Sequence, residues 1–231
     1  MSQLLYPVYP NSWPFVMEGR TVEAMTPGEA DKYWAEGWRH FGSDLFRSSL
    51  MVEEMCIKRQ VSLRLDVGTF TPSKSQRRTL RKNGDLEFEF GPARPGEDEL
   101  ALFGVHKERF ERNVPHSLAE FLGDRPDGKP CACLQLSVRR EGRLIAASFL
   151  ALGGNSCSSV YAVFDPAESK RRLGIYTMLL EIEHARSLGM ESYYSGYATV
   201  ETSCYDYKKQ FEGLSYFDWA GEWRPMEEMA L

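Results

Sequence analysis

The chain has 231 residues, of which 42% are apolar, and its formal net charge is −5. This size allows one large domain or two small ones, whereas the negative charge argues against a protein that coats nucleic acid through its whole surface. No apolar run is long enough to span a bilayer, and five cysteines without a secretion signal favour reduced thiols. We therefore expect a cytoplasmic protein with no membrane or DNA partner.

The first elements that the sequence predicts are a helix over residues 27–41 and a strand over residues 61–67. Thr26 and Glu29 form the pattern of a capping box, with Pro27 at the first helical position. In the strand, apolar and polar side chains alternate. Such alternation is typical of a strand with one buried and one solvated face.

A strongly cationic helix is predicted after this strand. Ser73 or Ser75 can cap it, and Gly84 is well placed to end it. Five cations fall within nine residues: Lys74, Arg77, Arg78, Arg81 and Lys82. A surface of this kind is either solvated or bound to phosphates.

The rest of the chain alternates strands and helices in an order that indicates an α+β fold. Strands are predicted over residues 86–90, 132–138, 143–152, 158–164, 192–198 and 213–219, and helices over residues 99–113, 117–123, 175–189 and 203–211. The three strands between residues 132 and 164 form a predicted antiparallel meander. The helix that follows them has an apolar face, and Thr177, Glu181 and His184 lie on its other, polar face.

This order resembles the acyltransferase fold of the GNAT superfamily, a mixed sheet flanked by helices. The resemblance implies a small N-terminal subdomain over residues 1–84, ending in the cationic helix, and a GNAT-like transferase domain over residues 85–231. Arg171 and Gly174 match the R-x-x-G part of the superfamily's pyrophosphate motif, and Tyr176 stands where its second small residue belongs. A helix start favours an anion, but the phenol would crowd a diphosphate. A phosphate carrier other than coenzyme A is therefore expected.

Two longer segments resemble the aminoacyl-tRNA protein transferase family, whose members add arginine or leucine to protein N-termini. Residues 70–86, FTPSKSQRRTLRKNGDL, are similar to the family's F-x-P-S-x-S-Q-R-R-x-x-R-x-N-x-D-L element. Residues 158–198 are similar to the strand, D-P, R-x-L-G-x-Y, helix and G-Y of its C-terminal domain. The resemblance implies an enzyme that transfers leucine or arginine from aminoacyl-tRNA to the N-terminal amine of a protein or peptide with an acidic first residue. Aminoacyl-tRNA would be the co-substrate, and no cofactor is implied.

Aminolysis of a charged tRNA needs no nucleophile from the protein. It needs a group that accepts a proton from the attacking amine, a group that stabilises the oxyanion, and a group that protonates the leaving ribose oxygen. The catalytic candidates are Asp165, Tyr197 and Tyr207. Asp165 either orients or deprotonates the amine, or it only starts a D-P turn. The resemblance implies a role near the donor for Tyr197 and protonation of the leaving group for Tyr207, and the alternative for both is packing in the core.

The candidates for binding tRNA are cations and the residues around the predicted helix start. They are Lys74, Arg77, Arg78, Arg81, Lys170, Arg171, Gly174 and Tyr176. With the family resemblance, the cationic helix is expected to contact phosphates of the acceptor stem. Tyr176 would stack on the terminal adenine or bond the ester.

The chain departs from the family in its cysteines. The family's N-terminal part carries a cysteine cluster that binds a metal or an iron-sulfur centre, whereas the corresponding region here offers only Cys56. We therefore expect no metal site. Two other functions stay open, namely a CoA-dependent N-acyltransferase, suggested by the order of elements, and an inactive module that binds tRNA or degrons.

Overall fold

A mixed sheet forms the centre of the computed structural model, which describes residues 13–53, 56–110, 114–203 and 205–229. Within these residues the sheet has nine strands. Their order is β12 (Trp223–Pro225), β11 (Leu214–Phe217), β5 (Cys56–Asp66), β10 (Ser192–Thr199), β9 (Ser156–Phe164), β8 (Arg143–Leu152), β7 (Cys133–Arg140) and β6 (Glu87–Pro92), with β4 (Leu50–Glu53) paired to β5. No helix in this described part is long and apolar enough to cross a membrane.

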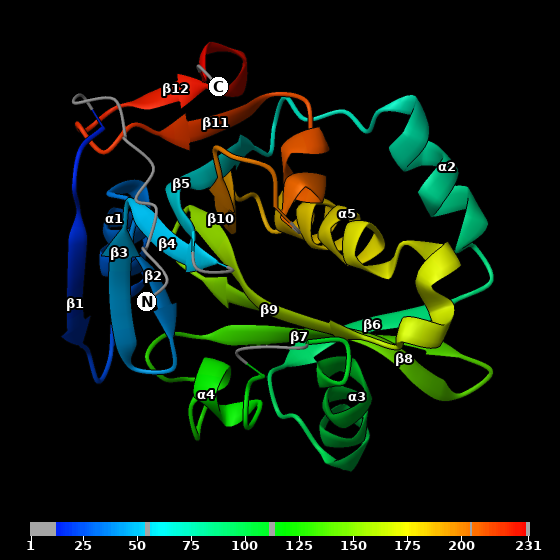
Figure 1. The fold of residues 1–231 in the computed structure, drawn as a ribbon. Helices are drawn as coiled ribbons and strands as arrows, with labels where there is room; N and C mark the ends of the chain where they lie inside the picture. Colours follow the sequence, from blue (N-terminus) through cyan, green and yellow to red (C-terminus); the bar gives the residue numbers. More distant parts are fainter. Residues whose placement is uncertain (1–12, 54–55, 111–113, 204, 230–231) are drawn as a thin grey trace, which may run out of the picture.

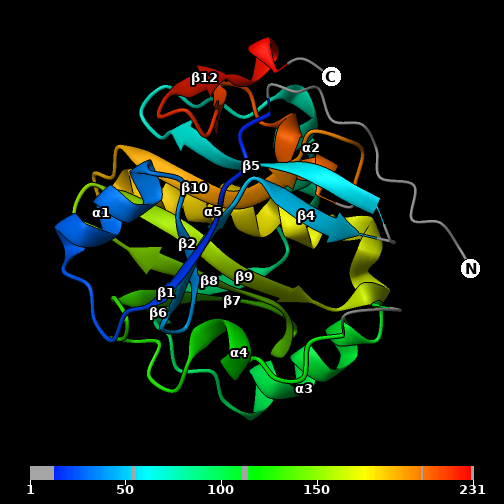
Figure 2. The same ribbon diagram turned by 60° about the vertical axis from the view of Figure 1, so that its left-hand side comes forward.

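Helices cover both faces of the sheet (Figures 1 and 2). They are α5 (Leu173–Ser187) and α2 (Lys74–Lys82) on one face, and α3 (Glu97–Lys107) and α4 (Ala119–Leu122) on the other. Three short 3-10 helices are η1 (Pro166–Arg171), η2 (Asp206–Gln210) and η3 (Met226–Glu228). This arrangement confirms the predicted α+β class, a mixed sheet flanked by helices.

The N-terminal part forms a smaller antiparallel sheet beside the large one. Its strands, in spatial order, are β1 (Met17–Thr21), β3 (Asp44–Ser48) and β2 (Arg39–Phe41), and α1 (Pro27–Ala35) precedes β2. Trp34 and Trp38 are almost completely buried in a cluster with Tyr194 of β10. Burial of such large rings stabilises the contact between the small sheet and β10.

The helix predicted over residues 27–41 begins as expected but ends early, as α1. Its capping box is present, because Thr26 Oγ1 accepts a hydrogen bond from Glu29 N at 3.3 Å and the Glu29 carboxylate accepts one from Thr26 N at 2.8 Å. The chain then turns at Gly37, whose φ is +83°, and a Cβ there would lie 2.8 Å from Phe217 Cδ1. Glycine is needed for this left-handed turn, and the residues that follow form β2 instead of a last helical turn.

Strand β5 begins five residues before the predicted strand over residues 61–67 and ends one residue earlier, and it lies between β10 and β11. The predicted boundary after residue 84 therefore does not separate two sheets. β5 precedes this boundary, but it belongs to the same sheet as the strands that follow it, β6 to β12. The cationic helix is confirmed as α2, which Ser73 caps by accepting a hydrogen bond from Gln76 N. Strands β1 to β4 and β12 were not predicted.

The crossover helix α5 connects β9 to β10, which run parallel. They pair only where Ser192–Tyr194 lie opposite Ser156–Ser158, and the two strands then part. β10 continues along β5 with a bulge between Tyr193 and Gly196, where the φ of Gly196 is +91°. This parting leaves room for a site in the middle of the sheet.

Candidate active site

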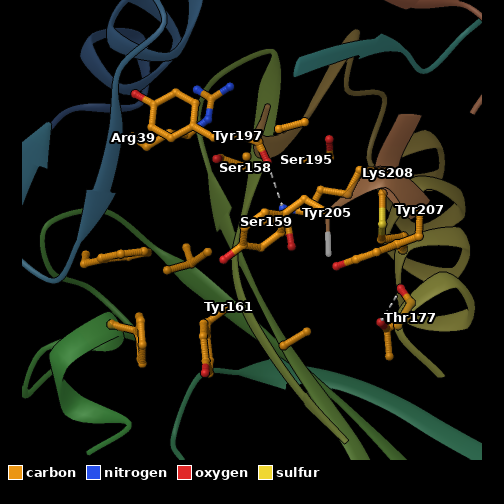
Figure 3. A pocket seen from close by; sticks show the side chains of 18 of the residues that line it. Arg39, Ser158, Ser159, Tyr161, Thr177, Ser195, Tyr197, Tyr205, Tyr207 and Lys208 are labelled. Carbon is orange, nitrogen blue, oxygen red and sulfur yellow. Dashed lines mark hydrogen bonds between the residues drawn. The ribbon is translucent and has the colours of Figure 1, made fainter. Parts of the chain in front are cut away.

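A cavity of about 430 Å³ opens where β9 and β10 part (Figure 3). Its walls come from these strands, the first turns of α5, η2, the end of α3, α4 and the small N-terminal sheet. Apolar side chains such as Phe41, Phe46, Phe121 and Met178 supply much of the wall. The polar residues on it include Arg39, Ser158, Ser159, Tyr161, Thr177, Ser195, Tyr197, Tyr205, Tyr207 and Lys208. An apolar cavity with a few convergent polar groups is the usual form of a substrate site.

Lys208 extends into the cavity from η2 (Figure 3). Its Nζ donates a hydrogen bond to the carbonyl oxygen of Tyr197 at 3.5 Å and lies 5.3 Å from the centre of the Tyr205 ring. Gly196 permits this approach, since a Cβ there would lie 3.2 Å from the Nζ. The cavity therefore holds a positive charge that can stabilise a developing negative one.

Two hydroxyl groups at the cavity have no hydrogen-bond partner among the described residues. They are Ser195 Oγ and Tyr161 Oη, and both atoms are buried. Burial raises the pKa of Tyr161 to about 12, so its hydroxyl stays protonated at neutral pH. Buried polar groups normally have partners, and both hydroxyls are available to a bound substrate.

Glu181 lies behind the cavity wall, on α5 and one turn after Thr177. It is 1% exposed and accepts a hydrogen bond of 2.5 Å from Tyr193 Oη. Ser159 Oγ, on the wall, lies 3.5 Å from its other carboxylate oxygen, at the long limit of a hydrogen bond. Burial raises the pKa of Glu181 to about 7, while its hydrogen bonds and the charge of Lys208 limit the rise. A carboxylate that titrates near neutral pH is thus connected to the cavity through Ser159.

The sequence did not point to Glu181, Lys208 or Arg39 as functional residues. The predicted polar face of α5 contains Thr177 and Glu181, but in the structure both are 1% exposed and face the sheet. The available signal was a pair of polar side chains one turn apart on a helix that connects two apolar strands.

Among the predicted site residues, Tyr197, Tyr207 and Gly174 line the cavity. Tyr207 points into it from η2, on the side of Thr177 (Figure 3). Tyr197 donates a hydrogen bond from its hydroxyl to the carbonyl oxygen of Gly37 at 2.9 Å, so this side chain also ties β10 to the small sheet. The catalytic roles of the two tyrosines stay predictions.

Asp165 does not line the cavity. Its carboxylate accepts a hydrogen bond from Ala167 N at 2.8 Å, which starts η1, and it pairs with Arg143 at 2.5 Å. The hydrogen bond from Arg143 holds the pKa of Asp165 below its usual value. The structure thus agrees with the alternative in which the D-P pair starts a turn, and it offers no contact that would support a role in deprotonating the amine.

Tyr176 does not line the cavity either. Its ring is 4% exposed, packs with Leu173 and Leu180, and directs its hydroxyl to the carbonyl oxygen of Asn83 at 3.4 Å. The expectation that this phenol would crowd a diphosphate at the helix start needs correction, because the side chain points into the core beside β6.

The predicted cations of α2 form one exposed stripe beside the start of α5. Lys74, Arg77, Arg78 and Arg81 are all exposed, and their spacing puts them on a single helical face. α2 is attached to the start of α5 by side-chain hydrogen bonds, including Arg172 Nη1 to Ser75 Oγ at 2.9 Å. The stripe therefore lies next to the end of the cavity that α5 forms.

Lys170 and Arg171 lie in a shallow groove between α2 and η1. The Arg171 guanidinium forms a fork of two 2.9 Å bonds with Asp85 and a further 3.0 Å bond with Glu168. Lys82 Nζ donates to the carbonyl oxygen of Lys170 at 2.7 Å. Arg171 thus fixes η1 to the end of α2, whereas Lys170 is exposed beside the stripe.

The described residues do not fit the metal or iron-sulfur centre of the resembling family. Cys56 is exposed, whereas Cys131, Cys133 and Cys157 are buried, and all four are free. Within the described ranges, no three His, Cys, Asp or Glu side chains gather closely enough to hold a metal ion. The fifth cysteine, Cys204, lies outside the described residues.

Comparison with known proteins gives a family profile, two relatives and a solved structure. The family profile described as "Arginine-tRNA-protein transferase, C terminus" matches residues 102–218. A protein from Marinobacter nauticus named aspartate/glutamate leucyltransferase is 31% identical over 83% of this chain and 80% of its own length. One of the same name from Chromohalobacter salexigens is 32% identical over 81% of this chain and 76% of its own. Among solved structures, L-PGS from Bacillus licheniformis is 16% identical, with a TM-score of 0.43, over 76% of this chain and 52% of that chain.

The profile spans 117 of the 231 residues, from 102 to 218, and these include β9, α5, β10 and η2 around the cavity. The two relatives extend the similarity over about four fifths of the chain. The chain therefore belongs to the arginine-tRNA-protein transferase family, as its two sequence segments predicted.

Proposed function

We propose that this chain transfers leucine from leucyl-tRNA to the α-amine of a protein or peptide that begins with aspartate or glutamate. The observation that carries the proposal is the similarity to proteins named aspartate/glutamate leucyltransferase over most of the length of both partners. Those names favour leucine over arginine as the transferred residue. Aminoacyl-tRNA is the co-substrate, no cofactor takes part, and the need for charged tRNA makes the cytoplasm the site of the reaction.

The reaction is the aminolysis of an ester. The amine nitrogen attacks the ester carbonyl carbon, a C–N bond forms, and the carbonyl oxygen becomes an oxyanion. Its collapse breaks the C–O bond to the ribose, whose oxygen leaves and takes up a proton. An α-amine has a pKa near 7.7 to 8.0, so a useful fraction is neutral at cellular pH, and positioning supplies much of the rate.

Three side chains around the cavity suit the remaining steps. Glu181 can accept the proton of the attacking amine through the Ser159 hydroxyl, because its pKa of about 7 lets it exist as a carboxylate. Lys208 can stabilise the oxyanion. Tyr207, on the α5 side of the cavity, can return a proton to the ribose oxygen.

The tRNA donor approaches this end of the cavity over α2 in our proposal. The exposed cations of α2 would contact phosphates of the tRNA backbone. Such contacts need several positive charges close together rather than an exact side-chain geometry. The 3′ end would then enter beside Gly174, at the positive end of the α5 dipole.

Replacing Arg78 by alanine is expected to weaken the binding of every tRNA to a similar extent. One lost phosphate contact should reduce the slope of log K against log salt concentration by about 1. Filter binding or fluorescence anisotropy at several salt concentrations measures this slope. Arg125→Ala serves as the control, because Arg125 is exposed and follows α4 in the chain, and α4 lies on the other face of the sheet from α2. Equal slopes for Arg78→Ala and the unmodified chain would rule out this phosphate contact.

The activity itself is tested with separate tRNA preparations, each charged with one amino acid, and a peptide that begins with aspartate. The expected product is the peptide with one added leucyl residue, detected by mass spectrometry and lost when the tRNA is first treated with RNase. Transfer of arginine instead would keep the reaction class and change the donor. Acetylation from acetyl-CoA, or tRNA binding with no transfer from any charged tRNA, would contradict the proposal.

A further inference from the structure

Arg39 places a buried cation at the cavity wall, away from the end formed by α5 (Figure 3). It belongs to β2 and is 5% exposed. Its Nη1 donates to the carbonyl oxygen of Trp38 at 2.5 Å, and its Nη2 donates to the Ser62 hydroxyl and to the carbonyl oxygen of Leu63 at 3.3 Å. The guanidinium is therefore fixed in position before any substrate binds.

The guanidinium has no counter-ion among the described residues. No described Asp or Glu forms an ion pair with Arg39, and its Nε has no hydrogen-bond partner. The ring centres of Tyr194 and Tyr197 lie 4.9 and 5.7 Å from the guanidinium, and the next residue, His40, is neutral because burial lowers its pKa to about 4. Burial lowers the pKa of Arg39 itself to about 10, so it is still a cation at neutral pH. A buried charge without a partner is costly to a folded protein.

Two partly buried arginines of the chain, Arg59 and Arg171, have carboxylate partners. Arg59 pairs with Glu201 at 2.7 Å, and Arg171 pairs with both Asp85 and Glu168. Arg39 differs from them in that it lines the cavity. The missing counter-ion is therefore expected from a bound molecule.

The surroundings of Arg39 limit what this anion can be. Phe41, Phe46 and Tyr197 enclose this part of the cavity with aromatic rings, which suits one compact anion on a short apolar stem. The planar guanidinium matches the geometry of a carboxylate. The exposed cations suited to a phosphate chain lie elsewhere, on α2.

We propose that Arg39 binds the side-chain carboxylate of the acceptor's first residue and thereby selects aspartate and glutamate. This inference rests on the proposed transfer reaction and identifies the residue that determines its acceptor specificity. The acceptor would lie across the cavity, with its α-amine near Ser159 and Lys208 and its first side chain directed to Arg39.

The test compares peptides that begin with Asp, Asn, Glu or Gln. The unmodified chain should prefer each acid over its amide. Arg39→Gln should lower kcat/KM for the Asp peptide at least tenfold, change that for the Asn peptide less than threefold, and leave tRNA affinity unchanged. Arg39→Lys keeps the charge without the planar fork and should retain part of the preference.

The matched control is Arg47→Gln. Arg47 lies on the adjacent strand β3, pairs with Glu18 at 3.0 Å and does not line the cavity, so the acid preference should be intact in this variant. A folded Arg39→Gln protein that still prefers Asp over Asn would overturn the proposal. So would a loss of tRNA affinity with an unchanged Asp to Asn ratio, because Arg39 would then serve a phosphate of the donor.

A second measurement needs no variant that might unfold. The ¹⁵N NMR signal of the Arg39 Nε–H in the unmodified chain should shift when the Asp peptide is added and should not shift with the Asn peptide. Equal shifts with both peptides, or none with either, would contradict the proposal. This readout is independent of transfer, so a failure of the proposed reaction and a failure of the Arg39 assignment are distinguishable.

Discussion

Replacing Glu181 by glutamine is expected to lower kcat about 100-fold, the usual contribution of a general base. The variant keeps the shape of the side chain and a hydrogen bond to Tyr193, but it cannot accept a proton. In the unmodified chain the amine loses its proton with a pKa near 7.7 to 8.0, and formation of the Glu181 carboxylate, with a pKa of about 7, adds a rise of kcat at lower pH. The variant should lose this rise and keep only the pH dependence of the amine. Rates of leucyl transfer measured from pH 5.5 to 9 give both results.

Glu183→Gln is the matched control for this experiment. Glu183 lies on the same helix, is exposed and pairs with Arg186 at 2.6 Å, so its loss should leave kcat and its pH profile unchanged. A Glu181→Gln variant with kcat within threefold of the unmodified chain would exclude Glu181 as the proton acceptor.

The same substitution also tests the raised pKa of Glu181 through its effect on stability. The pKa of Glu181 is higher in the folded chain than its usual value of 4.5, so the folded state binds the proton more tightly than the unfolded state. Its contribution to stability is fully present below pH 4.5 and is lost as pH rises to about 7, a change of about 3 kcal/mol. The groups around the carboxylate are Tyr193, Ser148, Ser159, Lys208, Cys157 and Cys133. Denaturant unfolding of Glu181→Gln should show a flatter pH dependence of stability, whether or not Glu181 takes part in catalysis.

Replacing Lys208 by methionine is also expected to lower kcat by about 100-fold, because a single group that stabilises an oxyanion commonly contributes that much. The KM for the peptide should change little if the charge acts mainly in the transition state. The charge of Lys208 lowers the pKa of Glu181, so its removal should also move the rise of kcat to higher pH. Steady-state kinetics at several pH values measure both effects.

Lys209→Met provides the control for Lys208→Met. Lys209 is the next residue of η2, pairs with Asp206 at 2.8 Å and does not line the cavity. If both lysine variants lose activity equally, the cause is the conformation of η2. If Lys208→Met retains its kcat, the oxyanion is stabilised by other groups, such as the hydroxyls of Ser195 and Tyr161.

The elements that build the cavity could be predicted because their patterns are long and regular. The meander, α5 and β10 have clear apolar periodicity, and the structure confirms their order. The strand β2 could not be predicted, because Trp34, Trp38 and Phe41 continue the spacing of a helix beyond α1 and only the packing of Phe217 against Gly37 shows why the helix ends. The short edge strands carry too few residues for a reliable period.

The candidate site was predicted only in part, for a physical reason. Tyr197, Tyr207 and Gly174 follow motifs that are continuous in sequence, and they reach the cavity. The roles proposed for Glu181 and Arg39 depend on their burial, which results from contacts between distant segments. From the sequence alone, a glutamate on a helix and an arginine next to a tryptophan are expected at the surface. Only the folded structure shows that they are buried. Asp165 is the opposite case: it belongs to a sequence motif and directly follows β9, but its ion pair with Arg143 holds it outside the cavity.

The position of β5 between β10 and β11 affects how the chain folds during synthesis. β5 leaves the ribosome well before its two neighbours, which are more than a hundred residues later in sequence. β4 pairs only with residues 56–59 of β5, so until the later strands emerge the backbone donors and acceptors of residues 60–66 have no strand to join. The candidate site is therefore assembled late, from both ends of the polypeptide, and a gene fragment that encodes either half alone would not produce it.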